Sequence, residues 1–176
     1  MEQISYHASV KEAITQALLI LMKHEPYEEI SVAEIVRKAG VGRSSFYRAF
    51  LDKDDVLEQY VTSLFSLSSQ LDDPYSSANL KQTIILHYRT YYENREFLKT
   101  LVRNRILYRF MGTMRMITED TIERNNLTIN IYQPAFFSAA CLGVLTRWLE
   151  RDCKETPEEV ADILITLLFH TPGRDL

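Results

Sequence analysis

Glycine, proline and cysteine are scarce in this chain of 176 residues. It contains five glycines, five prolines and two cysteines. Because glycine and proline most often interrupt helices, their scarcity favours a fold made of α-helices. Cys141 and Cys153 are too few for a disulfide framework or a cysteine-based metal cluster, so we expect both thiols to be reduced.

Patterns typical of metal sites, membrane segments and enzymes are absent from the sequence. The four histidines have no HxxxH or CxxC partner, so we predict no metal and no cofactor. No apolar run approaches the roughly 20 residues that cross a bilayer, and the N-terminus has no signal-peptide pattern, so we expect a cytoplasmic protein without membrane contact. Paired carboxylates, a nucleophile with its base and a phosphate-binding glycine loop are also missing, which argues against an enzyme.

The charge of the chain is unevenly distributed. Its net charge of −4 would be unusual for a protein that binds nucleic acid. Residues 1–53, however, hold seven basic and seven acidic side chains, whereas residues 54–176 hold thirteen and seventeen. The excess negative charge therefore belongs to the C-terminal part. The hydrophobic content of 46% indicates a globular chain rather than a disordered one.

A pair of short helices is predicted between residues 30 and 55. Ser31 stands three residues before Glu34, which is the spacing of a capping box, so a helix should begin at Val32. Gly40 should end this helix, because glycine adopts the left-handed conformation of a helix C-terminus without steric cost. The sequence therefore predicts a turn and a second helix directly after it.

The second of these helices has two different faces. Helical spacing places an apolar set on the packing side: Phe46, Ala49 and Phe50. The helix begins after the small Gly42, and the same spacing places cations and hydroxyls on its outward side: Arg43, Ser44, Tyr47 and Arg48. Such a face suits a helix whose N-terminal end enters the major groove of DNA. No acidic residue stands between Glu34 and Asp52, and the alternative is a set of solvated charges on an ordinary two-helix corner.

The order of these signals resembles the N-terminal signature of the tetracycline-repressor (TetR) family of transcription regulators. The matching features are the capping box, then Gly40-Val41, Ser44-Ser45, Phe46-Tyr47, Phe50 and Lys53. The resemblance implies phosphate contacts from four side chains: Ser31, Ser45, Tyr47 and Lys53. It places a second group near base edges: Gly42, Arg43, Ser44 and Arg48. The chain departs from the common pattern at Gly42, Ala49 and Leu51.

The helical pattern and the resemblance together predict an all-α protein of about nine helices. Residues 1–55 would form a helix-turn-helix DNA-binding domain, and residues 56–176 a helical effector-binding and dimerisation domain with a connecting helix at 56–71. The resemblance implies a dimeric repressor that a small-molecule effector releases from a palindromic operator in double-stranded DNA. Two alternatives stay open: a transcriptional activator of the same fold, and a helical protein-interaction module that does not bind DNA.

Helical spacing predicts further helices along the chain. The first should run from Val10 to Lys23. Asp52 should cap the helix after the motif and leave Lys53 exposed, and this helix should reach Leu71. The remaining predicted segments are a linker at 72–77, a helix at 80–94, a short segment around 97–102, a helix from about residue 104 to 117, an irregular stretch at 128–132, a helix at 135–149, and a capped helix that begins at Thr156-Pro157.

Aromatic, thioether and basic side chains are concentrated in the middle of the chain. We interpret some of them as the wall of an effector pocket: Tyr88, Tyr91, Tyr92, Arg103, Tyr108, Phe110 and Met114. Such a pocket would take a small ligand that is largely apolar or anionic. The alternative is that these residues form plain core, and that the six basic residues between Arg95 and Arg115 form a solvated face.

The last two predicted helices are apolar on more than one face. A single chain rarely buries such helices completely, which suggests an interface. The resemblance implies that they pair with their copies in a four-helix bundle, so a homodimer is expected. The candidate interface residues are Phe136, Ala140, Gly143, Arg147, Ile163, Leu164 and Leu167.

Overall fold

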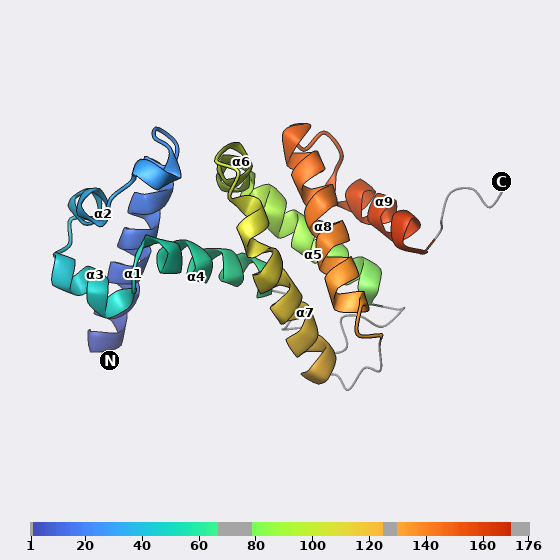
Figure 1. Ribbon diagram of the computed structural model, residues 1–176, viewed down its shortest axis with the longest axis horizontal. Coiled ribbons are helices and arrows are strands. Elements are labelled where there is room, and N and C mark those ends of the chain that lie inside the picture. The colour runs from blue at the N-terminus through green and yellow to red at the C-terminus, as the bar shows by residue number, and fades with distance from the viewer. Residues whose placement is uncertain (1, 67–78, 125–129, 170–176) are drawn as a thin grey trace. The chain divides into compact units, whose positions relative to one another are not determined.

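The computed structural model describes residues 2–66, 79–124 and 130–169, and these residues form helices and turns without any strand (Figure 1). The prediction of an all-α fold with about nine helices is confirmed over this part of the chain. The α-helices and two 3-10 helices are α1 (Glu2–Leu21), η1 (Tyr27–Glu29), α2 (Val32–Ala39), α3 (Arg43–Ala49), α4 (Lys53–Phe65), α5 (Leu80–Glu93), α6 (Arg95–Arg103), η3 (Leu107–Phe110), α7 (Met111–Arg124), α8 (Gln133–Glu150) and α9 (Pro157–Phe169).

The chain divides into two compact units, Met1–Val61 and Thr62–Leu176. Their boundary lies within α4, some residues beyond the predicted end of the DNA-binding domain at residue 55. Residues 67–71 of the predicted connecting helix and the predicted linker at 72–77 lie outside the described residues, as do residues 128 and 129 of the predicted irregular stretch at 128–132. No helix in the described part of the chain combines the length and the apolar character that a membrane crossing needs.

In the first unit, α1 packs against both α2 and α3. The side chains at the centre of this packing are completely buried: Ile14, Leu18, Ile35 and Phe46. Helix α1 begins well before the predicted start at Val10 and ends close to the predicted end. This unit is therefore a three-helix arrangement in which α1 supports the two helices of the motif.

Helix α4 begins as predicted. The Asp55 amide donates to Asp52 Oδ1 over 2.8 Å, which makes Asp52 the N-terminal cap. The Asp55 carboxylate in turn accepts from the Leu51 amide over 2.8 Å. These two bonds fix the sharp turn between α3 and α4.

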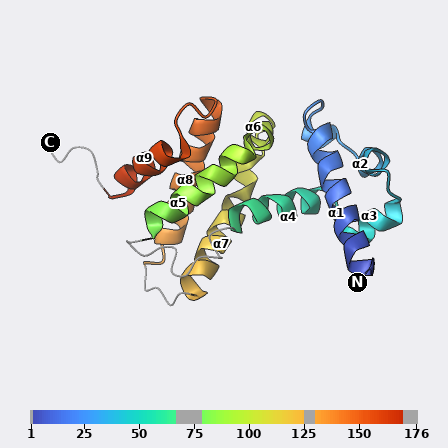
Figure 2. The same cartoon turned by 180° about the vertical axis from the view of Figure 1, so that it is seen from behind.

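In the second unit, α5 lies beside α9, and α8 lies beside α6 and α7 (Figure 2). The apolar core is formed between these helices and includes Leu98, Leu101, Leu107, Leu142 and Leu145. Helix α9 begins with the predicted capping box, because the Glu159 amide donates to Thr156 Oγ1 over 3.2 Å and the Thr156 amide donates to Glu159 Oε2 over 2.8 Å.

The prediction of one helix beginning near Asn104 is wrong. Helix α6 ends at Arg103, and Arg105 has a left-handed φ of 57°. The Ile106 amide donates to Leu101 O and the Arg105 amide to Val102 O, each over 3.0 Å, which is a Schellman termination. This termination uses arginine where glycine is usual, so no glycine in the sequence marks this turn. The 3-10 helix η3 follows, and α7 begins only at Met111.

Candidate nucleic-acid interface

The start of α2 is fixed by the predicted capping box. The Glu34 amide donates to Ser31 Oγ over 3.3 Å, and the Ser31 amide donates to Glu34 Oε2 over 2.9 Å. The Ser31 hydroxyl also donates to Glu34 Oε2 over 2.7 Å. The pKa of Glu34 is lowered from its usual 4.5 mainly by this hydroxyl bond and next by the bond from the Ser31 amide. The Ser31 hydroxyl therefore already has a partner on the protein, which any phosphate contact would have to replace.

The turn from α2 to α3 is fixed by Gly40, as predicted. Gly40 has a φ of 68°, and its amide donates to Arg37 O while the Val41 amide donates to Val36 O. Gly42 then occupies the N-cap of α3 in extended conformation and supplies no side-chain cap. It is exposed, so the backbone at the start of α3 is open to an approaching molecule.

The two predicted faces of α3 are confirmed. Phe46 is completely buried and Phe50 nearly so, and their ring centroids are 6.0 Å apart. On the other side Tyr47 is 60% exposed, although the edge of its ring still contacts Phe46. The remaining side chains of the outward face, Arg43, Ser44 and Arg48, are also exposed. Ser45 lies at the margin of this face and is half-buried.

The stretch that contains α2 and α3 carries four exposed cations. Arg37 and Lys38 in the last turn of α2 are exposed together with Arg43 and Arg48 of α3. Because no acidic residue interrupts the sequence from residue 35 to 51, this stretch has a local charge that would attract phosphate oxygens.

Lys53 departs from its predicted position. It is half-buried, and its ammonium donates to Tyr27 O over 2.8 Å, Ile30 O over 2.9 Å and Glu28 O over 3.1 Å. The prediction of an exposed lysine is therefore wrong. The physical reason is that the carbonyls at the end of η1 need donors, and the ammonium supplies them.

Of the residues predicted to line an effector pocket, some are buried and others are exposed. Tyr88 and Tyr91 of α5 are buried, with ring centroids 5.5 Å apart, and Tyr88 lies 5.3 Å from the ring of Trp148 in α8. Phe110 and Met114 are buried as well, but belong to η3 and α7. Three predicted lining residues are exposed instead: Tyr92, Arg103 and Tyr108.

Sequence reasoning missed two residues of this region, Trp148 and His87. Trp148 Nε1 donates to Glu155 O over 2.9 Å, which ties α8 to the turn before α9. Burial lowers the pKa of His87 to about 4, so its imidazole is neutral at physiological pH. His87 Nε2 is buried and, among the described residues, has no hydrogen-bond partner. A histidine on a tyrosine-rich helix was the only signal for it in the sequence.

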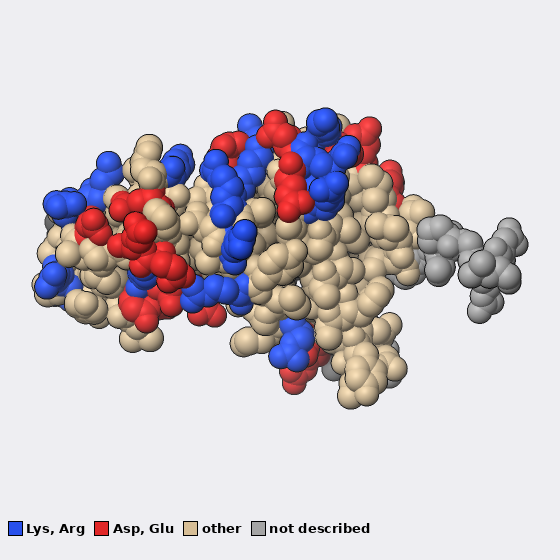
Figure 3. Space-filling view, turned by 45° about the horizontal axis from the view of Figure 1, so that its top comes forward, with Lys and Arg blue, Asp and Glu red and all other residues tan. Residues whose placement is uncertain are grey.

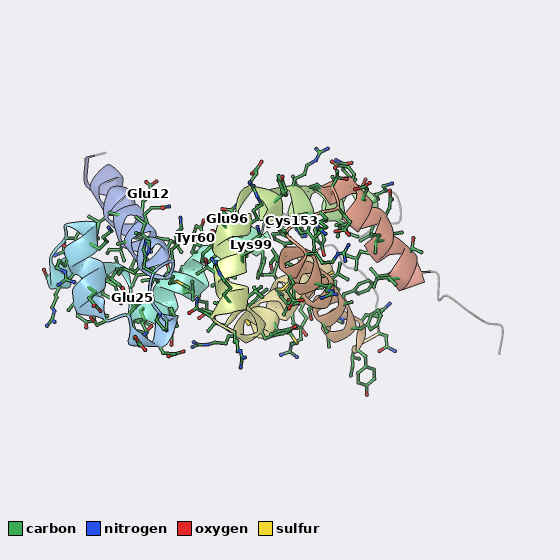
Figure 4. The ribbon with its side chains drawn as sticks, turned by 90° about the horizontal axis from the view of Figure 1, so that it is seen from above. Glu12, Glu25, Tyr60, Glu96, Lys99 and Cys153 are labelled. Carbon is green, nitrogen blue, oxygen red and sulfur yellow. The ribbon has the colours of Figure 1, made fainter. Side chains whose placement is uncertain are left out.

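The basic residues of α6 are engaged with the protein itself. Lys99 forms ion pairs with Glu96 over 3.2 Å and with Asp152 over 2.5 Å, and the Asp152 bond is the main reason that the pKa of Lys99 is raised. Arg95 lies 4.4 Å from the ring centroid of Tyr92 and donates to Tyr92 O. In Figure 4, Glu96 and Lys99 on α6 are labelled near Cys153 in the turn after α8. These contacts favour the interpretation of a surface with local charge compensation.

The residues predicted for a dimer interface lie mostly on the surface of the second unit. Five of them are exposed: Phe136, Gly143, Arg147, Ile163 and Leu167. Ala140 is half-buried, whereas Leu164 is only 1% exposed. The prediction for Leu164 is therefore wrong, because this side of α9 is buried against its own chain. Figure 3 shows charged side chains gathered over α6 and the turn between α8 and α9, and a largely uncharged surface elsewhere on that face of the unit.

Comparison with protein families assigns both units. Residues 14–60 match the model of the N-terminal region of bacterial regulatory proteins of the tetR family, and residues 78–170 match the model of a transcriptional regulator C-terminal region of the same family. The chain belongs to the TetR family. The TetR family is one of transcriptional regulators and not a class of enzymes, and α2 and α3 are its helix-turn-helix.

Individual relatives of this TetR-family chain are distant. The uncharacterized HTH-type transcriptional regulator YxbF of Bacillus subtilis (strain 168) is 23% identical over 165 residues, and the match covers 87% of this chain. The chain spans only 43% of the length of YxbF.

Two solved structures show the same fold. A TetR transcriptional regulator from Streptococcus agalactiae 2603V has a TM-score of 0.64 at 20% identity, and the match covers 96% of this chain and 98% of that one. The fatty acid degradation regulator FadR from Bacillus halodurans has a TM-score of 0.62 at 18% identity, and the match covers 94% of this chain and 97% of that one. At such identities the likeness concerns the fold alone.

The capping box of α2 makes the stability of the first unit depend on pH. Because the folded state lowers the pKa of Glu34, its carboxylate stabilises the fold above the unfolded value of 4.5, and this contribution is lost as the pH falls through the lower folded value. We expect Ser31→Ala to destabilise the protein by about 1 kcal/mol near neutral pH, and the deficit to shrink in acid.

Thermal unfolding of wild type and Ser31→Ala, followed by circular dichroism at several pH values, measures this deficit. Ser44→Ala, which removes an exposed hydroxyl near the start of α3, is the matched control and should leave stability unchanged. A deficit of equal size at about pH 7 and about pH 3 would contradict the assigned role of the Glu34 carboxylate.

Proposed function

We propose that this TetR-family chain binds a specific double-stranded DNA sequence and regulates transcription from it. The observation that supports the proposal most strongly is the outward face of α3, where Arg43, Ser44, Tyr47 and Arg48 are exposed while Phe46 fixes the helix in the core. A short helix with a rigid inner side and a cationic outer side can enter a major groove without deforming. Regulation of transcription would place the protein in the cytoplasm.

The proposal assigns different tasks to different side chains of the first unit. Arg43, Ser44 and Arg48 would reach base edges beside the open backbone at Gly42, since arginine pairs with guanine through two hydrogen bonds. Tyr47, Ser45 and Ser31 would contact phosphates, which position the protein without reading sequence. The hydroxyl of Ser31 would have to leave Glu34 for such a contact, so we expect its contribution to be the smallest of the three.

We further propose that the protein is a homodimer and that its operator is palindromic. Exposed apolar side chains on α8 and α9 support a dimer through these helices: Phe136, Ile163 and Leu167. A two-fold symmetric protein with one recognition helix in each copy would read two inverted half-sites. Ala140 and Gly143 are small enough for two copies of α8 to approach closely, and Arg147 would lie at the rim.

Repression that ends when an effector binds is the simplest mode of regulation for such a protein, and activation is the alternative. An effector must prefer the released conformation over the DNA-bound one, because equal affinity for both shifts nothing. The buried aromatic cluster of α5 and α8 supports a small, mainly apolar ligand, with tyrosine hydroxyls or His87 Nε2 as polar contacts. The fatty acid degradation regulator FadR shares the fold, which makes acyl chains reasonable first probes.

A helical protein-interaction module without DNA binding remains the second candidate function. Its support is the same set of exposed cations on α2 and α3, which could dock an acidic protein. Selection of bound oligonucleotides from a random pool separates the two candidates, because only a DNA-reading protein enriches one sequence. The symmetry of the enriched sequence also reports whether two copies bind together.

Substitutions on α3 test the proposed DNA contacts. We expect Arg43→Ala to weaken binding to the selected duplex by about 1 to 3 kcal/mol and to relax the preference at one base pair, because a bidentate base contact is lost. Tyr47→Phe removes only a hydroxyl and should weaken binding to all sequences alike. Arg115→Ala on α7 removes an exposed arginine from the second unit and is the control for charge. Unchanged affinity and selectivity in both α3 variants would refute this assignment.

Charges introduced on α8 and α9 test the proposed dimer. Gly143→Asp should be tolerated by the folded monomer, since a Cβ at this position meets no atom within 4 Å. We expect Gly143→Asp and Leu167→Glu to produce monomers, because an unpaired charge in an apolar interface is costly to desolvate. Met116→Glu places the same charge on an exposed apolar residue of α7 and should remain dimeric. Sedimentation measures the oligomeric state of the wild type and of all variants. A monomeric wild type at micromolar concentration would refute the proposed dimer.

Thermal-shift measurements test the proposed effector site. Fatty acids, aromatic acids and hydrophobic cations are the probes, and a bound ligand at about 100 times its dissociation constant should stabilise the protein by roughly 2.7 kcal/mol. Tyr88→Phe, which removes a buried hydroxyl, should reduce the shift, whereas Tyr108→Phe at an exposed position should not. If none of the three ligand classes raises the melting temperature, the aromatic cluster does not bind them and is part of the packed core.

A further inference from the structure

The helix-turn-helix is joined at its two ends by contacts that the family resemblance did not suggest. The chain enters the motif through η1 and Ile30, and leaves it at Lys53 and Asp54. Lys53 Nζ donates to three carbonyls of the entrance, those of Tyr27, Glu28 and Ile30. The Tyr27 hydroxyl donates to the Asp54 carboxylate. We call these contacts the entrance-exit clasp.

We infer that Lys53 is a positioning residue, which holds α3 in its DNA-reading orientation through the entrance-exit clasp, and that it does not contact a phosphate. This inference rests on the proposed function, because it assigns the residue a part in operator recognition. It differs from the role that the resemblance implied for this lysine.

The hydrogen bonds of Lys53 leave little for a phosphate. An ammonium has three protons, and three backbone carbonyls lie within 3.1 Å of Nζ. The same atom lies 4.6 Å from the ring centroid of Tyr27, which is only 1% exposed and cannot move aside. Turning the ammonium towards DNA would leave the carbonyls of η1 without these donors, so a phosphate contact would replace interactions rather than add one.

The clasp can act on α3 because the far end of α3 is held just before Lys53. Phe50, the C-cap of α3, is buried, and the ammonium of Lys11 from α1 lies 5.2 Å from its ring centroid. The Leu51 amide is fixed by the Asp55 carboxylate over 2.8 Å. Only a short turn therefore separates the buried end of α3 from the clasp, and loosening the clasp would let α3 tilt.

Binding measurements on two variants separate positioning from phosphate contact. Lys53→Met removes the three carbonyl bonds but keeps much of the side-chain length, and Tyr27→Phe removes the other half of the clasp at a residue too buried to touch DNA. Affinity is measured on the selected duplex and on a duplex of the same composition in scrambled order, from about 50 to 200 mM salt. Lys23→Met, an exposed lysine after α1, is the control for lost charge.

We expect Lys53→Met to lose affinity for the selected duplex by about tenfold, equivalent to about 1.4 kcal/mol, while affinity for the scrambled duplex and the salt dependence stay unchanged. Tyr27→Phe should show the same selective loss to a smaller degree, which keeps the test decisive if circular dichroism shows Lys53→Met to be unfolded. Lys23→Met should behave as wild type.

Two results would overturn the inference. Equal losses on both duplexes, with a salt slope smaller by about 0.9, would identify a phosphate contact. A lower melting temperature with unchanged affinity for both duplexes, measured well below melting, would show a role in stability alone. Failure of the wild type to enrich any sequence would instead refute the proposed function and is seen before the variants are made.

Discussion

The fixed length of α2 is the constraint on which the geometry of the first unit depends. Ser31 and Glu34 fix its first residue, and the left-handed Gly40 fixes its last. Each residue added to an α-helix rotates the following chain by about 100°. If α2 ended one residue later, the turn would leave it in another direction, and Phe46 could not enter the core while Arg43 and Tyr47 face outward. Two local sets of hydrogen bonds therefore determine which side of α3 is available to DNA.

Local signals of this kind made much of the fold predictable. The caps at Ser31, Asp52 and Thr156 involve residues three positions apart, so their pattern can be read in the sequence and was confirmed. The start of α7 was predicted too early, near residue 104, because the left-handed Arg105 turns the chain after α6 and the 3-10 helix η3 follows before α7 begins at Met111. Helix termination can thus be formed by hydrogen bonds of the main chain alone, for which the sequence contains no marker.

Predictions that depend on distant partners were less secure. The sequence around Lys53 is typical of an exposed helix start. The hydrogen-bond partners of Lys53, however, lie at residues 27 to 30, and nothing in the neighbouring sequence identifies them. Along α9, Leu164 and Leu167 are the same residue type on one helix, yet the first is buried and the second is 52% exposed. Helical periodicity identifies apolar positions but cannot say which of them pack inside the chain and which are left for a partner.

The separation of the two faces of α3 also has a consequence for how such a regulator can evolve. Phe46 and Phe50 provide the burial that holds the helix, whereas Arg43, Ser44, Tyr47 and Arg48 are exposed and contribute little to the core. Surface substitutions of this kind usually change stability by less than about 0.5 kcal/mol. On the proposed function, a duplicated gene could therefore acquire a new target sequence through a few changes on α3, while the body and its partners stay as they were.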